Sequence, residues 1–315
     1  MVSLRARKIL MAELSVHKSN KPWLKPSAST FLFHTTEYIS YQHNEVLYYG
    51  LLLDGVPVSQ ISFVQAGNNM FSMPKSPFGG FIIDGDMPTG GIQAFIKAIV
   101  SDSKIQNLQS LHITLPPACY GQHILHQVCK ELEYCGFQVS NEYPNQYITI
   151  TEKDFRQLLD GDERRYLNRA ATLKMTFRKL DLSYLSEAYT LFRACRDAKG
   201  YDISMSEEQL LDTMGNFPRE YMLFGLFLDK AMIAASLCIQ VNEHILYDFY
   251  HGDSLAHRQY SPIIPLMQGI YEYSRNIGVE LLDLGTSIAP GVFKFKKHMG
   301  AKASVKKSYC YQVLD

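Results

Sequence analysis

The sequence predicts a two-domain α/β protein in which one arrangement of strands and helices occurs twice. Its 315 residues are enough for two domains of about 100–200 residues each. Each half reads as a strand hairpin followed by helix, strand, helix and strand, which indicates a duplicated α/β domain rather than a short-period solenoid. We expect an N-terminal domain at 1–152, a basic helical linker at 153–181 and a C-terminal domain at 182–315.

The elements of the first half follow from its hydrophobic periodicity and turn residues. Asp54-Gly55 is a tight-turn dipeptide between the β-rich runs LYYGLLL and VPVSQISFV, so it predicts a hairpin. Apolar residues recur at helical spacing over 90–100 and 122–135, and Gly136 is placed to end the second helix. Further strands are predicted near 70–73, at SLHITL, at FQVSN and at YITIT.

The second half repeats this order. Helical stripes occur over 185–195 and near 210–214, before the strands YMLFGLFL, AMIAASLCIQV and HILYDFYH. A helix at 262–277, a strand at 279–284, a short helix at 291–299 and a last strand near 304–312 complete the prediction.

Composition narrows the class of protein. The 31 basic and 31 acidic side chains give no net charge, which argues against a general nucleic-acid or anionic-membrane surface. Six cysteines without a C-x-x-C pair indicate reduced thiols and no zinc site, and the ten histidines offer no catalytic metal site. No stretch is long and apolar enough for a signal peptide or a membrane span, so we expect a soluble cytoplasmic protein.

The strand at 279–284 and the helix after it form the most informative stretch. Asp283 lies at the carboxyl end of the strand, where open α/β sheets bind ligands. No Asp or Glu occurs between Leu284 and Leu314, whereas six lysines do, so a local anion preference is predicted. Lys296 is the first candidate to stabilise an oxyanion, and a solvated surface lysine is the alternative. Asp283 reads as a ligand-binding residue or as a turn-stabilising residue beside Gly285.

A second set of candidates lies on the strand HILYDFYH. Regular alternation would place Asp248 and Tyr250 on one face together with Leu246. Either could hold an acceptor amine, and Asp248 could act as the base, with a buried structural aspartate as the alternative. No G-x-S-x-G elbow occurs, so a serine nucleophile is not indicated.

Several stretches together resemble a known family. ERRYLNRA, SPIIPLMQGIYEYSRNIGVELLDLGTS and GVFKFKKHMGA are similar to the second half and linker of the tandem-GNAT FemAB-like acyltransferases, and SPFGGFII is similar to their N-terminal domain. The resemblance covers about residues 48–315 and implies two tandem GNAT-like domains, with mixed central sheets flanked by helices, joined by a helical linker. It also implies transfer of an acyl or aminoacyl group to a small-molecule or peptide amine.

The resemblance also suggests one catalytic residue and a donor, and the other site candidates come from the residues themselves. Lys296 matches the family's lysine, with Asp248 and Tyr250 as further catalytic candidates. Candidates for substrate binding are Asp283, Ser287, Lys294, Arg258 and Tyr260 in the second half and Phe78, Gly79 and Gly80 in the first. The donor implied is an acyl-CoA or an aminoacyl-tRNA.

The segment before the helix at 262–277 bears on that donor. GNAT enzymes bind the coenzyme A pyrophosphate on free amides of a Gly-rich loop, but this loop reads HRQYSPIIP. Ser261 and Pro262 are expected as N-cap and first helical residue, and Pro262 and Pro265 each lack an amide N–H. This departure favours a donor other than acetyl-CoA. The alternative function is a catalytically inactive GNAT-like module that binds a sugar-nucleotide or a peptide.

Overall fold

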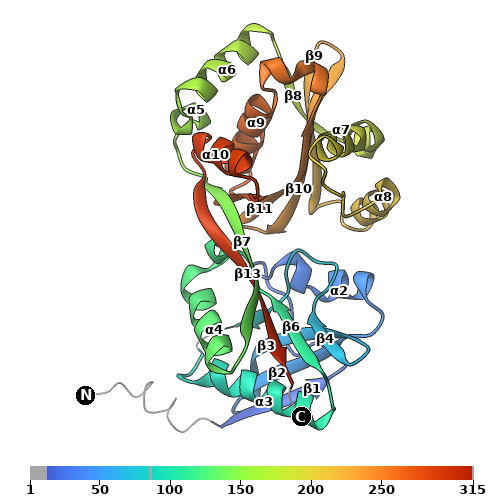
Figure 1. Cartoon of the computed structure of the whole chain (residues 1–315), viewed down its shortest axis with the longest axis vertical. Coiled ribbons are helices and arrows are strands. Elements are labelled where there is room, and N and C mark those ends of the chain that lie inside the picture. The colour runs from blue at the N-terminus through green and yellow to red at the C-terminus, as the bar shows by residue number, and fades with distance from the viewer. Residues whose placement is uncertain (1–12, 85–86, 314–315) are drawn as a thin grey trace, which may run out of the picture. The chain divides into compact units, whose positions relative to one another are not determined.

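The computed structural model describes residues 13–84 and 87–313 of the chain (Figure 1). These residues form two compact units. Unit 1 comprises the chain up to Tyr143 together with the residues from Val305 onward, and unit 2 comprises Pro144–Ser304. The outer limits predicted at residues 1 and 315 lie outside the described residues. Both units combine a mixed sheet with helices, so the predicted mixed α/β class is confirmed.

Unit 1 is built on a sheet with the order β1-β2-β3-β4-β6-β13. The short strand β5 lies outside this order and pairs with β3 at Ser59–Ile61, before the residues of β3 that pair with β4. The strands are β1 (Leu14–Ser19), β2 (Leu47–Leu53), β3 (Val56–Ala66), β4 (Asn69–Ser72), β5 (Phe81–Ile83), β6 (Ser110–Thr114) and β13 (Lys302–Gln312). The helices are α2 (Thr36–Gln42), α3 (Gly91–Ile105) and α4 (Gln122–Tyr134), with 3-10 turns η1 (Leu32–His34) and η2 (Ala118–Tyr120).

Unit 2 has the sheet order β7-β12-β11-β10-β9-β8. Its strands are β7 (Gln138–Thr149), β8 (Thr176–Leu180), β9 (Tyr221–Leu228), β10 (Ala231–Asn242), β11 (Ile245–Asp253) and β12 (Leu281–Thr286). Its helices are α5 (Phe155–Leu158), α6 (Gly161–Thr172), α7 (Leu185–Asp197), α8 (Glu207–Asn216), α9 (Ile263–Asn276) and α10 (Pro290–His298), with 3-10 turns η3 (Leu182–Tyr184) and η4 (Leu255–Tyr260). Helices α7 and α8 lie on one face of the sheet and α9 on the other (Figure 1).

The two sheets have the same order of pairings. In each, antiparallel pairs lead to a single parallel pair, β4–β6 in unit 1 and β11–β12 in unit 2, and one more antiparallel strand follows. That last strand is exchanged between the sequence halves, because β7 pairs with β12 and β13 pairs with β6. The compact units therefore differ from the predicted boundaries at 144–181 and at 305–315.

Two local predictions differ from the structure. FQVSN and YITIT belong to one strand, β7, which continues through the Pro144 that lies between them. The predicted helical linker ends as a strand, β8, in which β-branched and aromatic residues pair with β9. Strand β1 and helix α2 lie in a stretch too mixed in composition to give a periodic signal.

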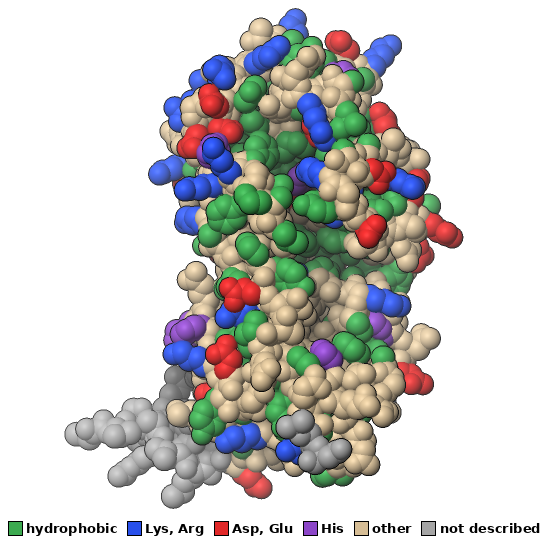
Figure 2. Space-filling model, in the orientation of Figure 1, with side chains coloured by type: hydrophobic (Ala, Val, Ile, Leu, Met, Phe, Trp, Pro, Cys, Tyr) green, Lys and Arg blue, Asp and Glu red, His purple; other side chains and the backbone are tan. Residues whose placement is uncertain are grey.

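Each unit has its own hydrophobic core. In unit 2 the core lies between the sheet and α9 and includes Phe224, Leu246, Ile270 and Leu282. In unit 1 it lies between the sheet and helices α3 and α4 and includes Phe63, Phe95, Leu111 and Leu132. Most charged side chains lie on the surface, where basic and acidic residues are interspersed on the face shown in Figure 2, whereas Asp248, Asp283 and Lys296 are buried. None of the described helices is long and apolar enough to cross a membrane.

Gly252 allows β11 to approach helix α7 closely. A Cβ atom at this position would lie 2.4 Å from the Leu191 carbonyl oxygen, which is backbone and cannot rotate away. We therefore expect Gly252→Ala to lower the free energy of unfolding by about 3 kcal/mol, at the upper end of overpacking effects. Urea denaturation followed by circular dichroism measures this loss.

Gly215→Ala is the matched control for Gly252→Ala. Gly215 lies in α8 with no atom within 4 Å of an added Cβ, so alanine there should be neutral or stabilise the helix by up to about 1 kcal/mol. Equal stabilities of the two variants would contradict the close approach of β11 and α7.

Candidate active site

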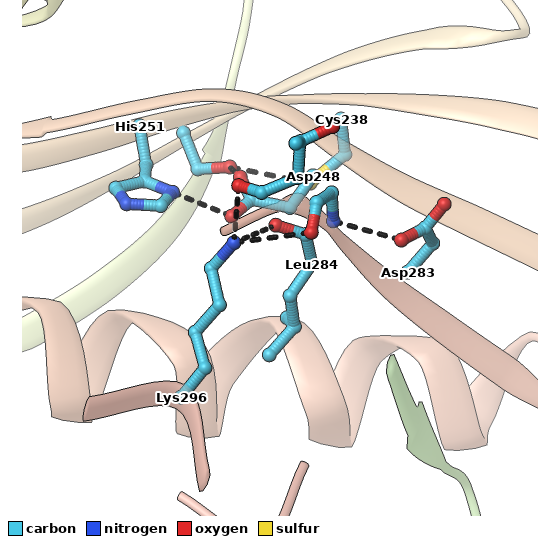
Figure 3. Close-up of polar contacts among 9 residues, drawn as sticks. Cys238, Asp248, His251, Asp283, Leu284 and Lys296 are labelled. Carbon is cyan, nitrogen blue, oxygen red and sulfur yellow. Dashed lines mark hydrogen bonds and ion pairs between the residues drawn. The ribbon is translucent and has the colours of Figure 1, made fainter. Parts of the chain in front are cut away.

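The strands β11 and β12 pair over three residues and then part. Their parallel ladder runs from Ile245–Leu281 to Tyr247–Asp283. Beyond it, Asp248 follows on β11, and the carbonyl groups of Leu284, Gly285 and Thr286 follow on β12. The carboxyl ends of parallel strands are the usual ligand-binding edge of an α/β sheet. The candidate site, which includes Asp248, His251 and Lys296, lies at this divergence (Figure 3).

A bulge in β11 determines which side chains reach the divergence. Tyr250 pairs with Leu237 and Asp248 pairs with Cys238, so Phe249 is an extra residue opposite β10. The extra residue breaks the two-residue alternation and brings Asp248 and His251 together, three positions apart. Asp248 and Tyr250 therefore do not share a face of β11, in contrast to the placement that regular alternation predicts. The Tyr250 ring packs against Phe192 of α7, and its hydroxyl group bonds to the hydroxyl of Ser204.

Asp248 and His251 form a hydrogen-bonded pair. The Nδ1 atom of His251 lies 2.6 Å from Oδ2 of Asp248, and the Ser236 hydroxyl donates to Oδ1 at 2.7 Å. A carboxylate only accepts, so Nδ1 carries the proton and Nε2 of the neutral ring has a free lone pair. The Asp248 side chain is fully buried, whereas that of His251 is 29% exposed. The pair therefore has the orientation that supports a general base.

The electrostatics keep Asp248 ionised in its buried position. Burial raises its pKa, but the charge that His251 carries when protonated, the hydrogen bonds from His251 and Ser236, and the charge of Lys296 together outweigh burial. The net result is a pKa below the ordinary value for aspartate. An ionised Asp248 stabilises the imidazolium that forms when His251 accepts a proton.

Lys296 extends from α10 toward this pair (Figure 3). Its side chain is buried, and its Nζ donates to the carbonyl oxygens of Leu284 at 2.6 Å, Gly285 at 3.2 Å and Thr286 at 3.1 Å. Burial lowers the pKa of Lys296 to about 8, although Asp248 and Asp283 oppose that shift. The solvated-surface alternative for this lysine is thus excluded. Its ammonium group satisfies the carbonyls that β12 exposes where it leaves β11.

Asp283 stabilises the turn at the end of β12. Its Oδ1 accepts from the Gly285 amide at 2.7 Å and from Nδ2 of Asn145 at 2.8 Å. The side chain is buried and contributes negative charge near Lys296. Ser287 is also buried beside this turn, and among the described residues its hydroxyl has no hydrogen-bond partner.

The other candidates from the sequence lie in separate places. Lys294 is exposed on α10, and Arg258 pairs with Asp253 at 3.3 Å. The guanidinium of Arg169 lies 5.0 Å from the centre of the Tyr260 ring. In unit 1, Phe78 is buried among aromatic rings, and Gly79 and Gly80 pack against Ser72 and Leu115. Within the described residues no group of three or more potential metal ligands occurs.

Sequence reasoning missed His251 and Ser236. The spacing Asp-x-x-His was visible in HILYDFYH, but on a regular strand these two side chains would point to opposite faces. Only the bulge at Phe249 places the two side chains on one face, and no residue type in the strand predicts that bulge.

The start of α9 differs from an anion-binding helix terminus. Pro262, the N-cap, and Pro265 have no amide hydrogen, and the Ile264 amide donates to the Ser261 carbonyl at 3.1 Å. Ser261 is left-handed with φ 49° and does not cap the helix, so the expected Ser261 N-cap is wrong by one residue. Of residues 262–265, only Ile263 has an amide left for a ligand, which is too few to hold a pyrophosphate.

Comparison with solved structures identifies the fold. FemX superposes with a TM-score of 0.67, covering 90% of this chain and 94% of that chain at 13% identity. The chain shares its fold with FemX. A tandem GNAT protein from the clavulanic acid biosynthesis pathway gives a TM-score of 0.54 at 10% identity, covering 86% of this chain and 83% of that one. L-PGS from Bacillus licheniformis gives 0.54 at 11% identity, covering 82% of each chain.

These structures are of the FemAB-like and GNAT type, as the sequence resemblance predicted. No protein-family model matches the sequence, and no curated protein matches it. The likeness to FemX is therefore one of fold, and the chemistry has to be argued from the residues of the site.

Proposed function

We propose that this protein transfers an acyl or aminoacyl group to an amine acceptor at the divergence of β11 and β12. The Asp248–His251 pair carries this proposal, because it leaves Nε2 of a partly exposed histidine free to accept a proton. The FemX-like fold is consistent with it. Lys296 and the turn at Asp283 complete the site.

The reaction requires one base and stabilisation of one developing charge. The acceptor amine attacks the acyl carbonyl carbon, and Nε2 of His251 takes a proton from the amine nitrogen. The carbonyl oxygen becomes an oxyanion, which the positive charge of Lys296 stabilises. Collapse of this intermediate breaks the bond to the leaving group, which departs with the proton returned from His251. An amide forms, and the donor loses its acyl group.

Lys296 can contribute to this step in spite of its carbonyl contacts. An ammonium group has three N–H donors, and all three are directed at carbonyl oxygens. The bonds to Gly285 and Thr286 are the longer ones, so an oxyanion can replace one of them while the 2.6 Å bond to Leu284 remains.

The donor we propose is an aminoacyl-tRNA rather than an acyl-CoA. A coenzyme A pyrophosphate needs several free amides at the start of α9, and one remains. The resemblance to FemAB-like enzymes points to the same donor class. Small or peptide amines are the acceptors.

Coenzyme A binding tests the choice of donor. Because the amide donors are missing, we expect calorimetry to detect no binding of coenzyme A below about 1 mM. Low-micromolar binding that is lost when residues 260–265 are replaced would favour an ordinary acetyl donor.

A transfer assay tests the activity itself. Labelled aminoacyl-tRNA is offered together with amino sugars, short peptides and cell-wall nucleotide precursors, and the label appearing on an amine is counted. The inactive-module alternative is supported by the saturated contacts of Lys296 and predicts binding of one of these acceptors without transfer.

A further inference from the structure

Unit 1 contains a cavity beside the segment that follows β6, the strand whose place in the order of pairings matches that of β12 in unit 2. It has a volume of about 320 Å³ and lies beside β5, the segment after β6 and the start of α4. In the shared order of pairings, β6 and α4 take the places of β12 and α10. The catalytic residues have no counterpart here, since Leu115 and Pro116 follow β6 and Ile124 and Val128 line the cavity from α4.

The walls of the cavity are mostly apolar. Phe31, Phe81, Ile83, Leu115, Ile124 and Val128 line it, and the side chains of Phe81 and Ile83 are only half-buried. A ligand that covers such accessible apolar side chains removes their surface from water, which lowers the free energy of binding. The charged lining residues are one lysine, Lys25, and one aspartate, Asp84, so the cavity has no excess of positive charge for a phosphate.

The hydroxyl groups of Ser27, Ser29 and Thr30 also line the cavity, with Ser27 Oγ 3.0 Å from Ser29 Oγ and 3.2 Å from Thr30 Oγ1, and His34 adds a further directional polar group. It is buried, and its Nε2 lies 2.9 Å from the Gly79 carbonyl oxygen, which can only accept. The proton is therefore on Nε2, and Nδ1 is an acceptor without a partner among the described residues. Burial lowers the pKa of His34 to about 4, in spite of the bond to Gly79, so the ring is neutral at physiological pH. The cavity thus presents an acceptor and no cation at this point.

We propose that unit 1 binds a small uncharged molecule that has an aromatic or branched aliphatic body and one O–H or N–H group directed at His34. The body fills the space between Phe31, Phe81 and Ile124, and the donor bonds to Nδ1 of His34. This is a binding site separate from the acyl-transfer residues, and it does not rest on the proposed function.

Two probes of nearly equal shape test the donor requirement. 4-Methylphenol carries a hydroxyl donor, and 4-fluorotoluene has the same outline without one. We expect 4-methylphenol to bind the whole protein with a Kd on the order of 1 mM and 4-fluorotoluene to bind about tenfold more weakly, as the loss of one hydrogen bond implies. Ligand-observed NMR titration gives both constants.

Two variants locate the site. His34→Phe keeps a ring but removes the acceptor, so the two probes should then bind equally. Leu125→Trp fills the cavity from α4 without touching the Gly79 bond and should abolish binding of both probes. Leu211→Trp, at an exposed position of α8 in unit 2, is the control and should leave the Kd of both probes unchanged. Equal binding of the probes to the unaltered protein, or binding that survives Leu125→Trp in a folded variant, would overturn the proposal.

Discussion

Replacing His251 with glutamine is expected to lower the rate of acyl transfer by about 10² to 10⁴, the usual contribution of a positioned general base. Glutamine keeps a donor toward Asp248 but cannot accept the proton of the amine. Asp248→Asn should give a loss of similar size, because asparagine would no longer fix the Nδ1–H tautomer or stabilise the imidazolium. Single-turnover transfer rates measure both effects.

His244→Gln is the matched control for His251→Gln. His244 lies in the turn before β11, is 46% exposed and contacts Glu243 and Glu280 at the surface. Its replacement should leave the transfer rate unchanged. A His251→Gln variant that is folded and fully active would remove the base from the proposed mechanism.

Lys296→Ala is expected to lower turnover by about 10² or more, comparable to the loss of one oxyanion donor. The alanine variant also leaves the carbonyls of Leu284, Gly285 and Thr286 without their partner, so part of the effect arises from a less ordered β12 end. Lys296→Met retains the apolar stem and separates the charge from the packing. Circular dichroism and denaturation of each variant show how much stability is lost.

The pH dependence identifies the charge of Lys296 as the active property. Because its pKa is lowered to about 8, the ammonium group loses its proton as pH rises through 8, and the transfer rate should fall above that value. Lys294→Ala, two residues away on the exposed face of α10, should behave as the unaltered protein at every pH. If Lys294→Ala and Lys296→Ala gave equal, small losses, the lysines would act only as a diffuse positive surface.

The sequence predicted the strands and helices of unit 2 well where the segment with hydrophobic periodicity was long. It placed β9, β10, β11, α9 and α10 within a few residues of their bounds, and it singled out Lys296 and Asp248 as candidate site residues. Lys296 and Asp248 stood out for the same reason, since a lysine in an acid-free window and an aspartate in an apolar strand are local contrasts in the sequence.

Three features were beyond sequence reasoning because they depend on pairing between distant segments. The bulge at Phe249 appears only when β11 is set against β10, and it decides that His251 rather than Tyr250 joins Asp248. The exchange of β7 and β13 depends on strand pairs more than 100 residues apart in the chain. The carbonyl contacts of Lys296 depend on where β12 leaves β11.

Rescue of a His251→Ala variant by added imidazole tests whether His251 is the general base. The variant leaves a space beside Asp248 in which free imidazole can bind and accept the proton of the amine. We expect His251→Ala to be slow, imidazole to restore part of the single-turnover rate in a concentration-dependent manner, and Asp248→Asn not to be restored. A His251→Ala variant that transfers at the unaltered rate without imidazole would show that His251 is not the base.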